Sequence, residues 1–186
     1  MTLKRSFAQL KGQHLLAFFF ENGVMYRILL LLSLVMFSPL ASADTLLSGR
    51  VIYVTDGDTL TLLDAKYQRI KVRLAEIDCP EQSQPYGKRA KLELKTLVHK
   101  KNVEITVIDV DRYDRVVGQV RASGVDINAE MVRRGAAWAY RRHLKRPELI
   151  QYEQAAREAA LGLWALPPQE RIPPWQWRHQ QRQSTR

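Results

Sequence analysis

The sequence predicts an α+β protein built mainly around a small five-stranded β-barrel with about three helices. Alternating apolar and polar residues indicate five strands, and a helical period appears after the third strand and again after the fifth. A length of 186 residues, with 46% hydrophobic and 26% charged residues, fits one globular domain with tails. This composition argues against wholesale disorder, and a single Cys excludes an internal disulfide.

Three strands are expected first, joined by short turns. Residues 46–55 form a β-rich run that ends at the Asp56-Gly57 turn. Residues 59–63 and 69–75 alternate side chains between two faces, as half-buried strands do. The meander is followed by a change of period over residues 87–100, where apolar residues fall on one face of a helix: Ala90, Leu94, Leu97 and Val98.

Two further strands, residues 103–110 and 116–122, complete the barrel. A cap at Asp126 or Asn128 opens a helix to Arg134, and Pro147 opens another that reaches about Leu163. Five strands with a helix after the third are typical of the oligonucleotide-binding (OB) barrel. We place this domain at residues 44–166 and expect an extended basic tail, rich in Pro, Trp and Arg, at residues 167–186.

Residues 1–43 indicate a signal peptide. Arg27 precedes an apolar run, Ile28 to Phe37, and Ala41-Ser42-Ala43 supplies a small-x-small cleavage site. The run is too short to span a membrane, which takes about 18 apolar residues. A signal starting at Met25 has an ordinary length, so we expect Met25 rather than Met1 to be the start. We therefore expect a periplasmic or secreted protein, a monomer, with no stable membrane insertion after cleavage.

The formal net charge of +10 favours polyanionic partners, either nucleic acid or an anionic membrane surface. Export places the protein in an oxidising compartment, where Cys79 is expected to be a lone thiol open to oxidation or to an intermolecular bridge.

Asp56-Gly57-Asp58-Thr59 is the first candidate site. An Asp-Gly pair between strands is often only a tight turn, because it supplies the positive φ angles that a hairpin needs. Asp58, however, falls on the same face of the strand as Leu60 and Leu62, because alternate residues of a strand point the same way. Its carboxylate is therefore expected to point toward the mouth of the barrel. A buried carboxylate needs a cation or hydrogen-bond donors.

The second candidate lies at the exit of the third strand, between Arg73 and Glu81. Taken alone, this segment is typical of polar surface residues that lead into a helix. The meander, however, brings Asp78 to Asp58, and this pair of hard oxygen ligands suits Ca²⁺. No His or Cys cluster in the sequence suits Zn²⁺. Glu81 is placed to hold or deprotonate a water, and Arg73 offers a planar fork of donors to a phosphate.

The third candidate is the polar segment Asp111 to Arg115, which taken alone is typical of a solvated turn. Combined with Arg73, it adds a second guanidinium that can stabilise the charge of phosphoryl transfer.

These three segments, in this order and spacing, resemble the staphylococcal nuclease-like (thermonuclease) family over roughly residues 48–164. The resemblance implies an OB barrel with added helices and a Ca²⁺-dependent phosphodiesterase that cuts DNA and RNA and leaves 3′-phosphate ends. It implies that Asp58 and Asp78 bind Ca²⁺, that the main-chain carbonyl of Cys79 is a further ligand, and that Asp56 supports the ligands from behind.

The resemblance also assigns the catalytic groups and the substrate contacts. Glu81 looks like the residue that activates the attacking water. Arg73 and Arg115 look like the pair that binds the scissile phosphate, and Arg112 and Tyr113 resemble positions that touch a neighbouring phosphate.

Two residues depart from the family pattern. Cys79 stands where Thr is usual, and it places a thiol near the metal. Asp114 stands where Gly is usual; Asp tolerates a left-handed turn, but its charge is expected to weaken substrate affinity.

Aromatic residues late in the chain divide into core and surface. Trp138 is expected in the core, and Tyr140 is expected to face the substrate. In the tail, we expect Trp175 and Trp177 to dock back onto the domain, while basic residues there add phosphate contacts: Arg178, Arg182 and Arg186.

The sequence as a whole favours an exported nuclease acting on DNA and RNA with little sequence specificity, since phosphate contacts carry no sequence information. The alternative is a non-catalytic OB-fold module that binds nucleic acid, which does not require the carboxylates. A protein that binds anionic envelope lipid or polymer would account for the charge alone.

Overall fold

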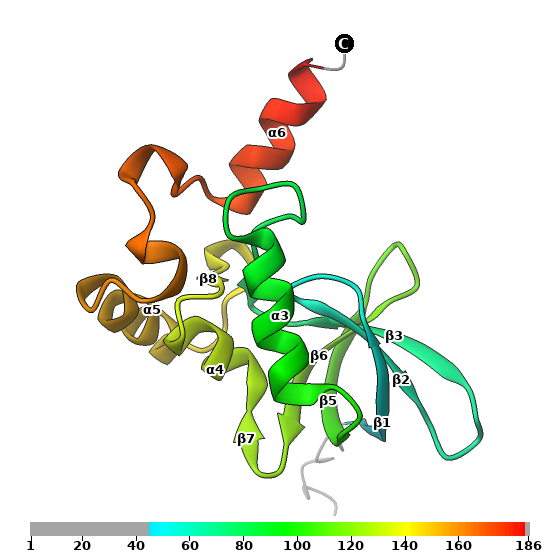
Figure 1. Ribbon diagram of the computed structural model, residues 1–186. Coiled ribbons are helices and arrows are strands. Elements are labelled where there is room, and N and C mark those ends of the chain that lie inside the picture. Colours follow the sequence, from blue (N-terminus) through cyan, green and yellow to red (C-terminus); the bar gives the residue numbers. More distant parts are fainter. Residues whose placement is uncertain (1–44, 185–186) are drawn as a thin grey trace, which may run out of the picture. The chain divides into compact units, whose positions relative to one another are not determined.

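The computed structural model describes residues 45–184, and Figure 1 shows how their strands and helices are arranged. The predicted signal peptide, residues 1–43, lies outside the described residues. Within residues 45–184, no helix combines the length and apolar character that crossing a membrane requires.

Five strands close into a barrel, as predicted. They are β1 (Leu46–Val54), β2 (Thr59–Leu63), β3 (Arg69–Leu74), β5 (Asn102–Val110) and β6 (Val116–Ala122). The sheet order is β3-β2-β1-β5-β6, with β7 (Val125–Asp126) at the end, and its consecutive strands are antiparallel. A parallel pairing of β3 with β6, with Val72 opposite Val116, joins the two ends of the sheet and closes the barrel.

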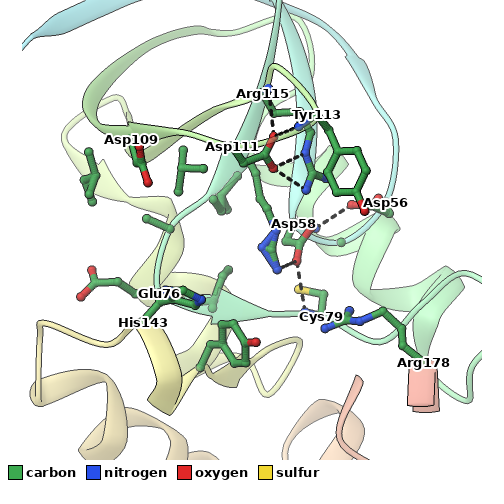
Figure 2. Close-up of a pocket in the computed structure, with 18 of the residues that line it drawn as sticks. Asp56, Asp58, Glu76, Cys79, Asp109, Asp111, Tyr113, Arg115, His143 and Arg178 are labelled. Atoms are coloured by element: carbon green, nitrogen blue, oxygen red, sulfur yellow. Dashed lines mark hydrogen bonds and ion pairs between the residues drawn. The ribbon is translucent and has the colours of Figure 1, made fainter. Parts of the chain in front are cut away.

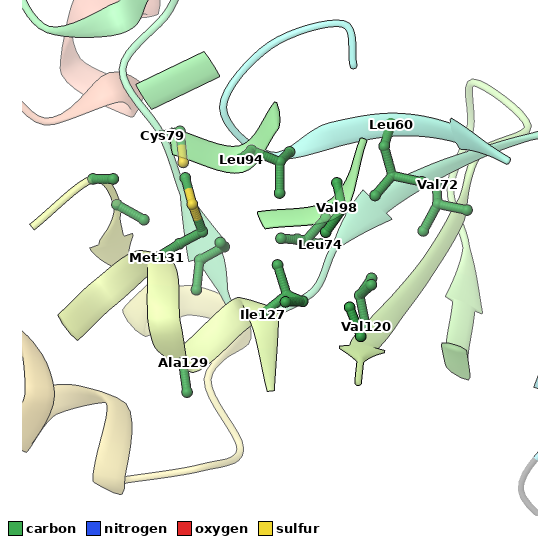
Figure 3. Packing of buried hydrophobic residues seen from close by; sticks show 14 of the residues in the cluster. Leu60, Val72, Leu74, Cys79, Leu94, Val98, Val120, Ile127, Ala129 and Met131 are labelled. Carbon is green, nitrogen blue, oxygen red and sulfur yellow. The ribbon is translucent and has the colours of Figure 1, made fainter. Parts of the chain in front are cut away.

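Side chains that point into the barrel form its core with one face of α3 (Gly87–Val98). Figure 3 shows Leu60, Val72 and Val120 from three strands facing Leu94 and Val98 of that helix. All five are fully buried. The inward-facing residues of the strands and the apolar face of α3 thus belong to one core. This shared core holds the helix against one end of the barrel.

The later helices are α4 (Ile127–Arg133) and α5 (Glu148–Glu158). Asp126 caps α4, since its side chain accepts a hydrogen bond from the Ala129 N–H at 3.0 Å. The sequence places the end of the last helix near Leu163, but α5 stops at Glu158, because Ala160 and Gly162 adopt positive φ angles of 49° and 58°.

A short sheet and three single-turn elements connect these parts. β4 (Ile77–Asp78) pairs with β8 (Trp138–Ala139) in an antiparallel arrangement. The 3₁₀ turns are Arg141–His143, Gly162–Ala165 and Pro168–Glu170. The pairing of β4 with β8 brings Asp78 opposite Trp138, and so fixes the candidate carboxylate to the helical part of the domain.

The prediction of an extended tail is wrong. Pro168 starts a 3₁₀ turn, and Pro174 starts a helix, α6 (Pro174–Ser184). Proline fits the first turn of a helix because its missing N–H would have no partner there. The predicted docking of Trp175 is confirmed, since its ring lies 5.7 Å from the Trp138 ring, and Pro174 is buried.

Glu76 ties the barrel to the segment before α5. Its Oε1 accepts hydrogen bonds from the Lys145 and Arg146 N–H groups at 2.7 and 2.8 Å, and its Oε2 pairs with the Arg146 guanidinium. Burial alone would raise the pKa of this carboxyl, but these donors outweigh burial and hold the pKa below its ordinary value.

Glu76→Gln is expected to lower the free energy of unfolding by about 2–4 kcal/mol at pH 7, because it removes the buried carboxylate that pairs with the Arg146 guanidinium and leaves that guanidinium with Asp126 as its one charged partner among the described residues. A lowered folded-state pKa contributes stability above the unfolded pKa, and this contribution is lost as the pH falls through the folded value. Urea titrations should therefore show the gap between variant and parent closing below about pH 4. The exposed control Glu104→Gln should change stability by less than about 0.5 kcal/mol; a similar loss in both variants contradicts the assignment.

Candidate active site

A cavity of about 650 Å³ at the mouth of the barrel brings together residues from the three candidate segments. Figure 2 shows side chains from the β1–β2 turn, the β5–β6 loop and α6 around this space. Nearly all predicted site residues line it: Asp56, Asp58, Arg73, Cys79, Glu81, Arg112, Tyr113, Arg115 and Tyr140. Asp78 does not line the cavity itself but contacts Arg73, which does.

Asp58 is held rigidly at the start of β2. One carboxylate oxygen accepts a hydrogen bond from the Thr59 hydroxyl at 2.9 Å, and the other faces the Cys79 N–H at 3.5 Å. Behind it, the Asp56 carboxylate accepts a hydrogen bond from the Asp58 N–H at 3.1 Å. Burial, followed by the charge of Asp58, raises the pKa of Asp56 to about 7. Asp56 thus fixes the backbone of Asp58, the residue that the family resemblance assigns to Ca²⁺.

Gly57 is required for a different reason from the expected one. It is absent from the described glycines with positive φ, so the turn does not exploit left-handed freedom there. A Cβ atom at this position would instead meet the Cβ atoms of Cys79 and Ala90 at 2.7 and 2.9 Å. The glycine therefore lets the Asp58 turn pack directly against the segment that carries Asp78.

Arg73, in β3, joins the two predicted metal carboxylates. Its Nη2 atom lies 3.2 Å from Asp58 Oδ2 and 3.1 Å from Asp78 Oδ1. The charge of Asp58 is the main reason why the pKa of Arg73 lies above its usual value. Asp78 is almost fully buried, and burial raises the pKa of its carboxyl, although Arg178 and Arg73 act in the opposite direction.

The donor set fits a hard cation. Two carboxylate oxygens, one from Asp58 and one from Asp78, converge on one nitrogen atom of Arg73, so both lie on the same side of the site. Ca²⁺ accepts carboxylate and carbonyl oxygens together with waters. Within residues 45–184 no three His, Cys, Asp or Glu side chains gather as a metal cluster. The side chains that could hold a cation here are Asp58 and Asp78, and the family resemblance adds the Cys79 main-chain carbonyl.

Glu81 lies at the edge of the cavity in the loop before α3, with its side chain 38% exposed. Gln84 fixes this loop, because its buried side-chain oxygen accepts a hydrogen bond from the Glu81 N–H at 3.1 Å. One Glu81 oxygen accepts a hydrogen bond at 2.7 Å from Arg178, a residue of α6. A water bound at this edge of the cavity would lie within reach of the carboxylate.

Arg178 is the main site residue whose contacts the sequence did not indicate. We expected it to bind phosphate from the tail, but its guanidinium instead bonds both Asp78 oxygens, at 3.1 and 2.6 Å. Figure 2 shows it reaching from α6 toward Cys79. It lies 100 residues from Asp78 in the chain, so no local pattern links the two.

The β5–β6 loop places Arg115 at the cavity and orders it. Asp111 Oδ1 accepts hydrogen bonds from the Tyr113 and Arg115 N–H groups, and its Oδ2 pairs with the Arg115 guanidinium at 2.7 Å. Burial would raise the pKa of Asp111, but the bonds from Arg115 and Tyr113 keep it below its usual value. Arg112 lies over the exposed Tyr113 ring. The predicted left-handed turn at Asp114 is confirmed by its φ of 60°.

The expectation of an oxidation-sensitive thiol at Cys79 is wrong. The side chain is 5% exposed and belongs to the hydrophobic core, where Figure 3 shows it near Met131. Burial raises the pKa of the thiol well above its usual value. Oxidation requires an accessible thiolate, so the folded chain protects this residue.

The predicted burial of Trp138 is confirmed, and the substrate-facing role of Tyr140 stays a prediction. Trp138 is buried against Trp164, with ring centroids 4.5 Å apart. Tyr140 is half-buried and lines the cavity, with its ring 5.6 Å from the Trp175 ring of α6.

Asp114→Asn is expected to tighten the binding of a fluorescent single-stranded oligonucleotide about two- to fivefold in chelator, because it removes one negative charge near the Arg115 loop. Asn accepts the left-handed conformation, so the turn should persist. Fluorescence anisotropy measures the effect, and Glu104→Gln on the outside of β5 is the control. An unchanged affinity for Asp114→Asn would show that this charge does not act on substrate.

Comparison with known proteins gives one family match. The family model described as "Staphylococcal nuclease homologue" matches residues 71–166. A Haemophilus influenzae protein named "Uncharacterized endonuclease" is 44% identical over 133 residues, which cover 72% of this chain and 74% of that protein. An Escherichia coli protein of the same name is 41% identical over 142 residues, 76% of this chain and 90% of the relative. The "Micrococcal nuclease" of Shigella flexneri is 40% identical over 148 residues, 74% of this chain and 83% of that protein.

Proposed function

Since this chain belongs to the staphylococcal nuclease family, we propose that it is an exported Ca²⁺-dependent nuclease that cuts DNA and RNA with low sequence specificity and leaves 3′-phosphate ends. Nuclease activity, and with it hydrolase chemistry, is supported by the family match and by relatives named endonuclease and micrococcal nuclease. The observation that carries the proposal is the contact of one Arg73 nitrogen with both Asp58 and Asp78. Arg73, Asp58 and Glu81 line the same cavity.

Asp58, Asp78 and the Cys79 carbonyl are the groups that would hold Ca²⁺. When bound, Ca²⁺ supplies positive charge that neutralises the phosphate and the charge developing on it. Asp56 fixes the backbone at Asp58, and Thr59 fixes one of its oxygens, so the carboxylate keeps its orientation. Preorganisation of this kind avoids rearrangement during the reaction.

Glu81 is the proposed general base. Its partly exposed carboxylate takes a proton from a water at its Oε atom, and the water oxygen forms a bond to phosphorus. In the same displacement the bond between phosphorus and the 5′ oxygen breaks, and that oxygen takes up a proton from a second water, so the phosphate stays on the 3′ side. The hydrogen bond from the Glu81 N–H to Gln84 keeps this loop in place.

Arg73 and Arg115 are the proposed phosphate ligands. Phosphoryl transfer spreads negative charge over the equatorial oxygens, and two guanidinium groups can stabilise it. Arg73 is fixed by its two carboxylate partners and Arg115 by Asp111, so both donors stay at the cavity.

The rim residues contact the strand on either side of the scissile bond. Arg112 and Tyr113 lie together on the β5–β6 loop, and Tyr140 offers a ring on the opposite side. Guanidinium contacts to phosphate and stacking on bases tolerate any sequence, which accounts for the proposed low specificity.

Export and a monomeric state complete the proposal. The apolar run Ile28 to Phe37, led by Arg27 and followed by Ala41-Ser42-Ala43, supports a signal peptide and a periplasmic or secreted protein. The proposed reaction uses groups of a single chain, so we propose that the protein acts as a monomer.

The purified protein is expected to degrade plasmid DNA and total RNA in Ca²⁺ and to leave both intact in excess chelator. Arg73→Ala should lower the rate by at least about 10³-fold, because it removes a phosphate ligand that also holds the carboxylates. Gel assays and end-group analysis for 3′-phosphate provide the measurement. Degradation that persists in chelator or in the variant would contradict the proposal, and binding without cleavage under every metal would indicate a non-catalytic OB-fold module.

Glu81→Gln is expected to lower kcat by about 10²–10⁴-fold and to change oligonucleotide affinity by less than about threefold, because the amide keeps the shape but cannot accept a proton. Single-turnover rates give the chemical step, and anisotropy gives the affinity. Equal losses of rate and affinity would show that Glu81 binds substrate instead of activating water.

A further inference from the structure

Arg178 occupies the carboxylates that the proposed reaction needs. Its Nη2 donates to Asp78 Oδ2 at 2.6 Å, and its Nη1 donates to Asp78 Oδ1 at 3.1 Å and to Glu81 Oε1 at 2.7 Å. One guanidinium therefore engages both oxygens of a proposed metal ligand and one oxygen of the proposed base. Within residues 45–184, Arg182, four residues further along α6, makes no ion pair with Asp78 or Glu81.

The position of Arg178 is set by contacts that do not involve the carboxylates. The ring of Trp175 lies against Trp138 and Tyr140, with centroids 5.7 and 5.6 Å apart. The side chain of Gln84, whose oxygen holds the Glu81 N–H, donates its amide to the Ile172 carbonyl just before α6. These contacts fix α6 beside the cavity, so Arg178 reaches Asp78 from an anchored helix rather than from a free tail.

Arg178 and a cation would need the same lone pairs. Asp78 already accepts a hydrogen bond from Arg73 on Oδ1, and Arg178 bonds that oxygen and the other. A divalent ion bound between Asp58 and Asp78 must take oxygen lone pairs from Asp78, and its charge repels a guanidinium in contact with the same carboxylate. Arg73 and Arg178 together take three of the roughly four lone-pair positions of the Asp78 carboxylate, so Arg178 and a cation compete for this residue.

We propose that Arg178 competes with Ca²⁺ for Asp78 and so sets the Ca²⁺ concentration at which the active site assembles. The inference rests on the proposed Ca²⁺ site. Without the ion, Arg178 closes on Asp78 and Glu81 together. When the ion binds, the guanidinium leaves Asp78, and the same displacement releases the Glu81 carboxylate. Metal binding and release of the base are thereby one event, and α6 is a latch that keeps the nuclease inactive where Ca²⁺ is scarce.

Calorimetric titration of the purified protein with CaCl₂, without nucleic acid, tests the competition directly. Arg178→Gln is expected to bind Ca²⁺ at least about tenfold more tightly than the parent, because the competing charge is gone. Arg182→Gln, one turn further along α6 and lining the same cavity, should bind as the parent does. Unchanged or weaker binding by Arg178→Gln would overturn the proposal, as would equal tightening in both variants.

Trp175→Ala provides a second route, because it loosens the docking of α6 while leaving Arg178 in the chain. It should also tighten Ca²⁺ binding, and circular dichroism checks that the barrel remains folded. An affinity equal to that of the parent in this folded variant would count against an anchored latch.

Hydrolysis assays at increasing Ca²⁺ concentration distinguish a failure of the competition from a failure of the proposed nuclease function. The Ca²⁺ concentration for half-maximal activity should fall in Arg178→Gln in step with its binding constant. A calorimetric shift with no hydrolysis in any protein would uphold the competition and refute the nuclease proposal. Hydrolysis in all proteins with identical Ca²⁺ dependence would refute the competition and leave the nuclease proposal standing.

Discussion

The site depends on the contact of Arg73 with two buried or nearly buried carboxylates, Asp58 and Asp78. Two like charges placed side by side away from water repel one another unless a cation lies between them. The guanidinium meets that requirement in the described state, and a hard metal ion meets it equally well. The barrel brings the three residues together, because β2 and β3 are paired neighbours and β4 follows directly.

The site is also supported by a close packing contact between the Asp58 turn and the Cys79 segment. Gly57 lets the Asp58 turn touch the Cys79 segment, and the Cys79 side chain faces the core while its backbone faces the carboxylates. A change that only enlarges residue 57 would thus push apart the two proposed metal ligands. The close approach of the two backbone segments at Gly57 and Cys79 therefore serves both the packing of the core and the placement of the proposed metal ligands.

Sequence patterns predicted the barrel well, because each strand and the helix after β3 carry a local period that matches their burial. They also indicated the carboxylates and arginines, which cluster in short segments. They failed at the tail, where Pro167, Pro168, Pro173 and Pro174 suggested an extended chain although the last of them starts α6. The contacts of Arg178 and the burial of Cys79 arise only from tertiary packing, which no local pattern encodes.

A crystal structure of the Ca²⁺-loaded protein would show whether Asp58 and Asp78 bind the ion and whether Arg178 gives way to it. We expect one ion about 2.3–2.6 Å from oxygens of Asp58, Asp78 and the Cys79 main chain, with Arg178 withdrawn from Asp78. An ion bound elsewhere on the barrel would contradict the proposed metal site. An ion on these three ligands with Arg178 still paired to Asp78 would contradict the latch.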